Sequence, residues 1–285
     1  MTYHARINLI MLTTIVGLVV FLYIKPQSHQ VQEYKISSLS AEAAQSIKIL
    51  HHDSSILLKK QENIWHLIEP VFARADEKKV AQLLEVLSAT SDRRFPLKDR
   101  DRFGLDKPNV QLHIDHEFFD FGGLSPVTNQ QYVATDVGVF LISPRYAVRL
   151  PSQPTNIVSE TLLAVSENPV SFELDDIIIK RENGEWVISP ANIEQHLSQE
   201  EFIRWIELWQ GASASNIIFD SELLENKNVT LADKEIKISL SNGQIIQFKI
   251  WQQGDKQFLI RNGEAVRYVF SGDVAKSLLD PYHHQ

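Results

Sequence analysis

The sequence predicts an α+β protein: an N-terminal transmembrane helix followed by two similar units, each a mainly antiparallel sheet with a packed helix. Three observations predict it. Residues 7–24 form an apolar run. Residues 57–70 and 178–190 share one pattern, in which two apolar and two basic residues precede a tryptophan and a proline. An amphipathic helical stripe follows each copy. The copies agree where a core needs apolar residues and differ elsewhere, which indicates a duplicated scaffold.

Composition limits the classes of function. The chain has 285 residues, 44% of them hydrophobic, which fits two domains of about 100 to 150 residues. The formal charge is -8 without a basic stripe, which argues against nucleic acid and against an anionic lipid surface, since both require clustered Lys and Arg. The absence of cysteine excludes disulfides, thiolate metal sites, cysteine nucleophiles and a lipidated N-terminal cysteine.

The apolar run at 7–24 predicts a membrane anchor. A helix of this length measures about 27 Å, close to the hydrocarbon thickness of a bilayer. The residues after it lack the small side chains of a cleavage site, so we expect the anchor to remain uncleaved. Arg6 and the terminal amine narrowly outweigh Lys25 and favour a cytoplasmic tail at residues 1–6. The polar residues 25–46 predict a tether to the rest of the chain.

Residues 47–150 predict the first unit. Three short strands open it, at 47–50, 56–58 and 65–67. Asp76 is a good N-cap for the helix that follows, whose apolar stripe comprises Val80, Leu83, Leu84 and Leu87. Four more strands are predicted at 110–114, 118–121, 131–134 and 139–142, followed by a short helix after Ser143.

Residues 171–285 repeat this plan as the second unit. Ser198 and Glu201 form a capping box before a second apolar stripe. The stripe contains Trp205 and Trp209, which we expect in the core; the alternative is that one of them projects as a hot spot for a partner. The later strands are predicted at 235–240, 244–251, 257–260 and 266–270, with Ser271 capping a short helix. Residues 151–170 predict a connector with a helix at 156–165.

A series of short motifs carries a resemblance to a known family. In order, the motifs are Trp65-His66-Leu67 with Pro70, Ala75-Asp76, Phe103-Gly104-Leu105-Asp106 with Pro108, and then Gly122 and Tyr132. This pattern resembles a bacterial family known as domain of unknown function 4340. The resemblance implies a membrane-anchored envelope protein, in some members encoded beside ABC transporter subunits related to gliding-motility systems. It therefore implies an accessory role, and it carries over no catalytic residue because the family has none assigned.

One group of residues is a candidate metal site. His113, Asp115 and Glu117 alternate along a predicted strand, which places nitrogen and oxygen donors on one face. The alternative is a solvated face, which we favour because the spacing suggests no further ligand. The adjacent pairs His51-His52 and His283-His284 cannot chelate alone, because neighbouring strand residues point to opposite faces. We expect loop histidines and no metal site.

The other candidates have structural alternatives that we favour. Asp175 and Asp176 could form an acid and base pair, but they are adjacent and no cleft is indicated. Ser125 and Ser271 do not lie in the Gly-x-Ser-x-Gly elbow of a hydrolase. Gly122-Gly123 lacks the Lys and Ser/Thr of a phosphate-binding loop, so we expect a turn.

A further candidate is a charged run. Charges alternate in sign from Arg93-Arg94 through residues 98–102. This pattern predicts a surface loop, and the functional alternative is a contact with a partner.

These observations predict no catalytic, cofactor-binding or metal site. We expect a membrane-anchored, non-catalytic binding or scaffolding protein of the bacterial envelope, with its soluble part in the periplasm and a protein partner there. The alternative is an envelope hydrolase that acts on glycan or peptide with carboxylates from both units. Two carboxylates within about 10 Å of each other in a groove would favour the hydrolase. A groove lined by Leu, Phe and Trp would favour binding. A spacer without a ligand is a third alternative.

Overall fold

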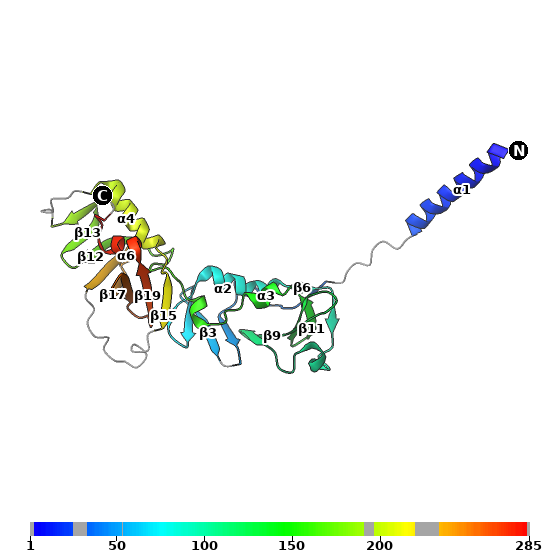
Figure 1. Cartoon of the computed structure of the whole chain (residues 1–285), viewed down its shortest axis with the longest axis horizontal. Coiled ribbons are helices and arrows are strands. Elements are labelled where there is room, and N and C mark those ends of the chain that lie inside the picture. Colours follow the sequence, from blue (N-terminus) through cyan, green and yellow to red (C-terminus); the bar gives the residue numbers. More distant parts are fainter. Residues whose placement is uncertain (1–2, 25–32, 53, 191–196, 220–233, 284–285) are drawn as a thin grey trace.

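The computed structural model describes residues 3–24, 33–52, 54–190, 197–219 and 234–283. In these residues the chain forms an N-terminal helix, two large sheets, a two-stranded sheet and short helices that pack on the large sheets (Figure 1). The strand pairs in all three sheets are antiparallel. The expected mainly antiparallel α+β class is therefore confirmed.

Helix α1 (Tyr3–Ile24) contains the predicted apolar run. From Tyr3 to Phe21 it is long and apolar enough to cross a membrane once, and none of these side chains is buried. A core helix buries its apolar side chains, so α1 is not the core helix of the described fold.

The first sheet has nine strands in the order β5-β4-β3-β2-β8-β9-β10-β11-β7. In β2, Ile47 and Ile49 are fully buried and Lys48 between them is exposed, because successive strand residues point to opposite faces. The strands predicted for this unit are all present. The bounds of the strands in this sheet, including the unpredicted β5 and β7, are β2 Ser46–Leu50, β3 Ser55–Gln61, β4 Ile64–Glu69, β5 Ala73–Arg74, β7 Arg94–Phe95, β8 Val110–Ile114, β9 Glu117–Leu124, β10 Gln131–Thr135 and β11 Gly138–Ile142.

Helix α2 (Glu77–Leu84) covers the apolar face of this sheet. Asp76 accepts hydrogen bonds from the backbone N–H groups of Lys78 and Lys79, which confirms the predicted cap. The predicted stripe extends to Leu87, but the last turn is a separate 3-10 helix, η1 (Glu85–Ser88). A second short helix, α3 (Arg145–Val148), follows β11.

The second sheet has eight strands in the order β14-β13-β12-β16-β17-β18-β19-β15. The four later strands predicted for this unit are present, and Gly243 and Gly263 lie in hairpin turns between them with positive φ angles of 85° and 87°, where glycine is favoured. The bounds are β12 Pro169–Leu174, β13 Ile177–Glu182, β14 Glu185–Ser189, β15 Asn216–Phe219, β16 Lys234–Leu240, β17 Ile245–Gln253, β18 Lys256–Arg261 and β19 Val266–Ser271.

Helices α4 (Gln199–Gly211) and α6 (Gly272–Leu279) pack on the second sheet. The predicted capping box of α4 is present. Trp205 and Trp209 are both buried, and their ring N–H groups donate to the backbone oxygens of Ser277 and Leu278 in α6. Both tryptophans therefore fill the core, as expected. Ser271 lies at the N-cap of α6, but its side chain makes no capping hydrogen bond.

Residues 33–46, here called the strap, lie in the range expected to be a tether but bind to the first unit. Strand β1 (Tyr34–Lys35) pairs with β6 (Thr90–Ser91), and Ile36 and Ala44 are buried in the core. Two carboxylates hold the strap. Asp115 accepts from the backbone N–H groups of Gln45 and Ser46, and Glu117 accepts from the hydroxyls of Ser37 and Ser38 and from the Ser38 N–H.

Replacing Glu117 with glutamine is expected to lower the free energy of unfolding by about 1 kcal/mol at pH 7, because a neutral amide replaces a charged acceptor. Burial would raise the pKa of Glu117, but the hydrogen bonds from Ser37 and Ser38 lower it below its ordinary value. A lowered pKa in the folded protein stabilises it above the unfolded pKa of about 4.3, and that stabilisation is lost as the pH falls through the folded value.

Urea unfolding at pH 7 and pH 3 measures this effect. The difference between Glu117→Gln and the parent protein should shrink at pH 3, and an equal difference at both pH values would contradict the assignment. Glu62→Gln is the control, because Glu62 is exposed in a hairpin turn.

The connector is not the helix predicted at 156–165. It forms a 3-10 helix, η3 (Pro154–Ile157), and then an extended segment in which Val158 bridges to Ala75 and Thr161 bridges to Ser213. In the extended form the backbone groups of the connector bond to segments on both sides, whereas a helix would bond these groups to one another.

Candidate functional site at the junction of the two sheets

The two large sheets are joined through main-chain hydrogen bonds. The connector bonds to the β5 edge of the first sheet and to the segment that precedes β15 in the second, and the β18–β19 turn bonds directly to the first unit. The donor and acceptor pairs are Asp76 N and Ile157 O at 2.8 Å, Ser159 N and Arg74 O at 2.9 Å, Ala214 N and Glu160 O at 2.9 Å, and Ala265 N and Phe72 O at 2.8 Å. The junction is thus part of the fold and is not a free linker.

A buried arginine lies at the centre of this junction. Arg74, from β5 of the first sheet, is 5% exposed. Its Nε donates to Glu264 Oε1 of the second unit at 2.6 Å. Its Nη2 donates to the backbone oxygens of Thr161 and Leu162 in the connector and lies 3.2 Å from the Tyr268 hydroxyl. One side chain therefore contacts both units and the segment between them.

A second ion pair lies beside Arg74. Arg261 Nη1 and Nη2 donate to the two oxygens of Glu167 at 2.9 and 2.5 Å, which is the bidentate geometry of a strong pair. Arg74 Nη1 lies 3.9 Å from the same carboxylate, and Arg261 Nε lies 3.8 Å from Glu264. The Tyr268 hydroxyl donates to Glu264 at 2.5 Å. These five residues form a closed network, here called the junction cluster, in which two cations face two carboxylates.

The junction cluster holds its groups in fixed protonation states. Burial alone would lower the pKa of Arg74, but Glu264 and Tyr268 raise it above its ordinary value. Burial would raise the pKa of Glu167, but Arg261 lowers it. Burial and Glu264 together raise the pKa of Tyr268. The arginine and tyrosine thus keep their protons and Glu167 stays ionised, so this carboxylate is a poor proton donor.

A hollow of about 360 Å³ opens beside the junction cluster, with walls from both units. The β3–β4 hairpin and Phe72 form one wall, and the β18–β19 turn forms the other. The rings of His66 and Phe72 stack in it, with centroids 5.1 Å apart and planes at 13°. Its size and its place between two units are typical of ligand sites.

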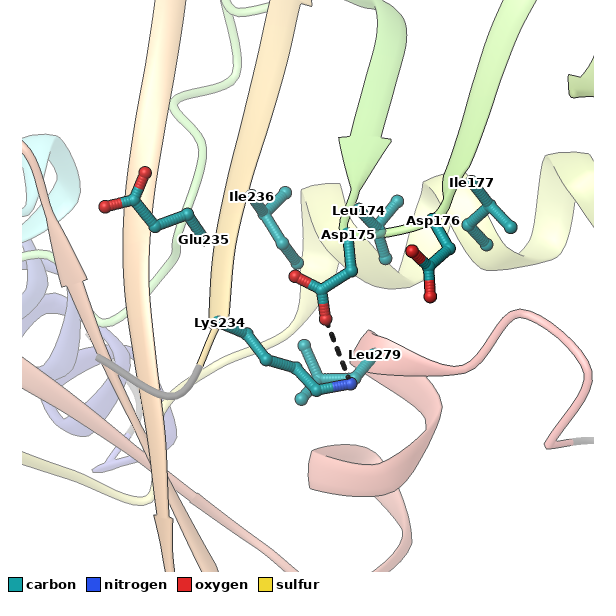
Figure 2. Close-up of a pocket in the computed structure, with 8 residues that line it drawn as sticks. All are labelled: Leu174, Asp175, Asp176, Ile177, Lys234, Glu235, Ile236 and Leu279. Carbon is teal, nitrogen blue, oxygen red and sulfur yellow. Dashed lines mark ion pairs between the residues drawn. The ribbon is translucent and has the colours of Figure 1, made fainter. Parts of the chain in front are cut away.

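The aspartate pair suggested by the sequence lines a smaller pocket of about 180 Å³ in the second unit (Figure 2). Asp175 and Asp176 are the two residues of the tight turn between β12 and β13, and Asp175 has a positive φ of 28°. Asp175 pairs with Lys234 at 3.3 Å, and Figure 2 shows Glu235 pointing away from this pair. Both aspartates are exposed. A pocket is therefore present where no cleft was expected, and a turn accounts for the aspartates.

The three candidate metal ligands do not converge. Asp115 and Glu117 hold the strap, and His113 remains on β8 with Nε2 buried and without a hydrogen-bond partner among the described residues. Across the described parts of the chain, no three His, Asp or Glu side chains are grouped closely enough to hold a metal ion.

The remaining candidates have structural contacts. His51 Nε2 lies 2.9 Å from the backbone oxygen of Pro151. Ser125 Oγ accepts from the Thr128 N–H within a turn. His283 follows α6 near the end of the described chain, and residue 284 lies outside the described residues. None of these contacts forms a nucleophile and base pair.

The motif residues of the first unit form a packed cluster on the second face of its sheet. Phe103 and Tyr132 have ring centroids 4.8 Å apart, and Leu105 is buried below them. A Cβ atom on Gly122 would lie 2.3 Å from the backbone oxygen of Phe103. Gly122 belongs to β9, so the expected turn at Gly122-Gly123 is wrong. The glycine permits the loop that carries Phe103 to approach the sheet closely.

Gly122→Ala is therefore expected to destabilise the protein by about 1–3 kcal/mol, because the added methyl group overlaps backbone that cannot move aside cheaply. Thermal unfolding measures the loss. Gly123→Ala is the matched control on the same strand, since its Cβ would lie an ordinary 3.6 Å from the same oxygen. Equal melting temperatures for the two variants would contradict this packing.

The junction cluster was not predicted from the sequence. Its members are Arg74, Glu167, Arg261, Glu264 and Tyr268, and the Arg74–Glu264 pair is 190 residues apart in sequence. No spacing rule connects such residues. The one available signal was the position of Arg74 directly before the Ala75-Asp76 motif.

Comparison with known proteins identifies the family. No curated protein and no solved structure matches the chain. The model of one family, described as domain of unknown function (DUF4340), matches residues 65–216, from β4 of the first sheet to the start of β15 in the second. The matched segment contains Arg74, Glu167 and the whole connector. It covers more than half of the 285 residues, and the chain therefore belongs to the DUF4340 family.

Proposed function

We propose that this chain is a membrane-anchored, non-catalytic scaffolding protein of the bacterial envelope, in which two similar units act as one rigid body. The observation that carries this proposal is the junction cluster together with the main-chain bonds around it. Buried ion pairs favour one arrangement of their neighbours, because any other arrangement leaves a charge unpaired. A rigid two-unit body fits a scaffold, which must present a surface at a fixed position.

Strand order supports the duplication that this proposal includes. Leaving out β5, the first sheet runs β4-β3-β2-β8-β9-β10-β11-β7, and the second runs β14-β13-β12-β16-β17-β18-β19-β15. Each unit thus takes its strands in the same sequence order along the sheet. The helix contacts also correspond. The backbone N–H of Trp65 donates to the Glu77 side chain of α2, and the backbone N–H of Trp186 donates to the Gln199 side chain of α4.

A groove beside the connector supports a binding role. Two adjoining hollows of about 420 and 240 Å³ share Lys79 and Asn156. The side chains of Gln82, Thr155 and Asn156 line them and make no hydrogen bond within the described part of the protein. Uncommitted amide and hydroxyl groups in a concave surface are available to a protein partner.

Cross-linking of the intact protein in cells tests the proposed role. The resemblance to envelope proteins encoded beside ABC transporter subunits leads us to expect a transporter permease among the products. Photo-reactive groups at Gln82 and Asn156 should capture it, and one at exposed Ile245 in the second sheet should not. Capture of only bulk lipid and chaperones from every position would count against the role.

The proposed location is the inner membrane, with α1 as a single span and the remainder in the periplasm. The chain has no cysteine, so a single introduced cysteine reports its own exposure. Val165→Cys, at a fully exposed position, should react with a membrane-impermeant maleimide in intact cells. Tyr3→Cys should react only after the membrane is opened. The reverse pattern would invert the orientation.

The hydrolase remains the second candidate, and one observation bears on it. Glu167 and Glu264 come from the connector and the second unit, and both contact Arg74, so their carboxylates lie within about 10 Å of each other. However, both are paired with arginines, whereas such a hydrolase needs one protonated carboxyl group. The pairing favours the scaffold.

A further inference from the structure

The strap shortens the chain between the anchor and the folded part. Because β1 pairs with β6 and Asp115 and Glu117 hold the residues that follow, only residues 25–33 separate the end of α1 from β1. Ten peptide steps at about 3.5 Å span at most about 35 Å. If residues 33–46 were all tether, the span could be more than twice as long. The strap therefore keeps the first unit close to the bilayer that holds α1.

The place where the strap enters determines which edge lies nearest the bilayer. Strand β1 pairs with β6 at the β11 side of the first sheet, and the chain continues from β6 into β7. In Figure 1, β6 and β11 lie at the end of the first unit that is away from the second sheet, and α6 lies in the second unit. The β6–β7 edge is thus the part of the fold that α1 can approach most closely.

Side chains on this edge suit a lipid surface. Arg93 and Arg94 are exposed, and so is Lys35 on β1. Two exposed apolar side chains accompany them: Leu97 is 38% and Val137 is 47% exposed. Arg94 Nε donates to the Val137 backbone oxygen at 3.1 Å, which holds the arginine beside the apolar residue. Arginines with apolar neighbours bind phosphate groups with the guanidinium while the stem contacts acyl chains.

The charge of the edge differs from that of the whole chain. The formal charge of -8 argues against an anionic surface for the chain as a whole. On this edge three cations face outward beside three carboxylates: Asp92, 4.0 Å from Arg93, Glu33, which accepts from Thr90, and exposed Asp136, next to Val137. The edge is therefore close to neutral, in contrast to the whole chain, and its arginines can donate to lipid phosphates while the apolar side chains contact the bilayer.

We propose that this edge, defined by Lys35, Arg93, Arg94, Leu97 and Val137, rests on the phosphate-bearing headgroup surface of the bilayer that holds α1. The inference depends on the proposed anchoring by α1. It gives a role to Arg93 and Arg94 of the charged run suggested by the sequence, which lie at the start of β7. The contact fixes the orientation of the first unit, and the junction cluster passes that orientation to the second.

Quenching by labelled lipid tests the proposal on the full chain in vesicles that contain phosphatidylcholine and phosphatidylglycerol. Single cysteines at Leu97 and Val137 carry a fluorophore, and headgroup-labelled lipid quenches it. Val274→Cys, 41% exposed on α6 of the second unit, is the control. We expect the quenching at Leu97 and Val137 to be at least threefold stronger than the quenching at Val274. Equal quenching at the three positions would overturn the proposal.

Two further measurements make each outcome decisive. The double variant Arg93→Gln with Arg94→Gln should reduce the quenching at Leu97 at least twofold, and unchanged quenching would show that the arginines do not contribute to the contact.

A fluorophore at Ile10, 66% exposed on α1, reports insertion of the helix through quenching by tail-labelled lipid. If the fluorophore at Ile10 is quenched and the quenching at Leu97 and Val137 equals that at Val274, the edge contact is wrong while the anchoring by α1 stands. If Ile10 is not quenched, the anchoring fails, and the edge contact with it.

Discussion

Replacing Arg74 with methionine is expected to lower the free energy of unfolding by about 3–5 kcal/mol. The methionine fills similar space but leaves Glu264, which is 7% exposed, without its main cationic partner. It also removes the donors to Thr161, Leu162 and Tyr268. Urea unfolding followed by tryptophan fluorescence measures the loss. Because four of the five tryptophans lie in the second unit, exchange of backbone hydrogens in the first unit should be followed in parallel.

The two probes also test the rigid junction. In the parent protein both units should unfold in one transition, because the junction cluster couples them. In Arg74→Met the transitions of the two units should separate. A variant that loses stability but keeps one shared transition would show that other contacts couple the units.

Matched variants distinguish a buried pair from an exposed one at the same junction. Lys79 pairs with Glu160 at 3.1 Å, but the two side chains are 37% and 48% exposed. Lys79→Met is therefore expected to lower the free energy of unfolding by at most about 1 kcal/mol, since solvent screens the pair.

The double replacement Arg74→Met with Glu264→Leu should recover more than half of the stability lost in Arg74→Met, because no unpaired charge remains buried. A double variant as unstable as Arg74→Met would contradict the pairing.

The sequence predicted the regular elements well because their patterns are periodic. β8 begins and ends at the predicted residues, and Asp76 and Ser198 cap α2 and α4 as expected. The short strands β1, β5, β6 and β7 were missed, since two residues cannot display a period of two. The connector was predicted as a helix at 156–165, in the stretch between Pro154 and Pro169. The main-chain partners offered by both sheets favoured the extended form.

The contacts that join distant segments could not be predicted in the same way. The strap is polar, and polar composition indicates a tether when no partner is known. Its partners are Asp115 and Glu117, which the sequence presented as possible metal ligands. We expected these carboxylates on a solvated face, but they accept hydrogen bonds from backbone and hydroxyl groups of the strap. The junction cluster needs the packed arrangement of both units before its charges meet.

Trp209→Ala is the second large effect, with an expected loss of about 3–5 kcal/mol. Trp209 is fully buried, and its ring packs between Phe172 and Phe248, with centroid distances of 5.9 and 5.8 Å. Alanine leaves a cavity, and it also leaves the Leu278 backbone oxygen without the indole donor at 3.0 Å. Trp209→Phe should lose less, because a six-membered aromatic ring stays in the core, and only the donor and the rest of the indole are removed.

Ile203→Ala on the same helix is the matched control, since Ile203 is 47% exposed, and we expect a change below about 1 kcal/mol. Hydrogen exchange in α6 separates the core role from a partner role. If Trp209 holds α6 on the sheet, exchange across Gly272–Leu279 should accelerate in Trp209→Ala and not in Ile203→Ala. If Trp209→Ala instead left stability and exchange unchanged and abolished partner capture, the tryptophan would be a hot spot and the packing of the second unit would need another explanation.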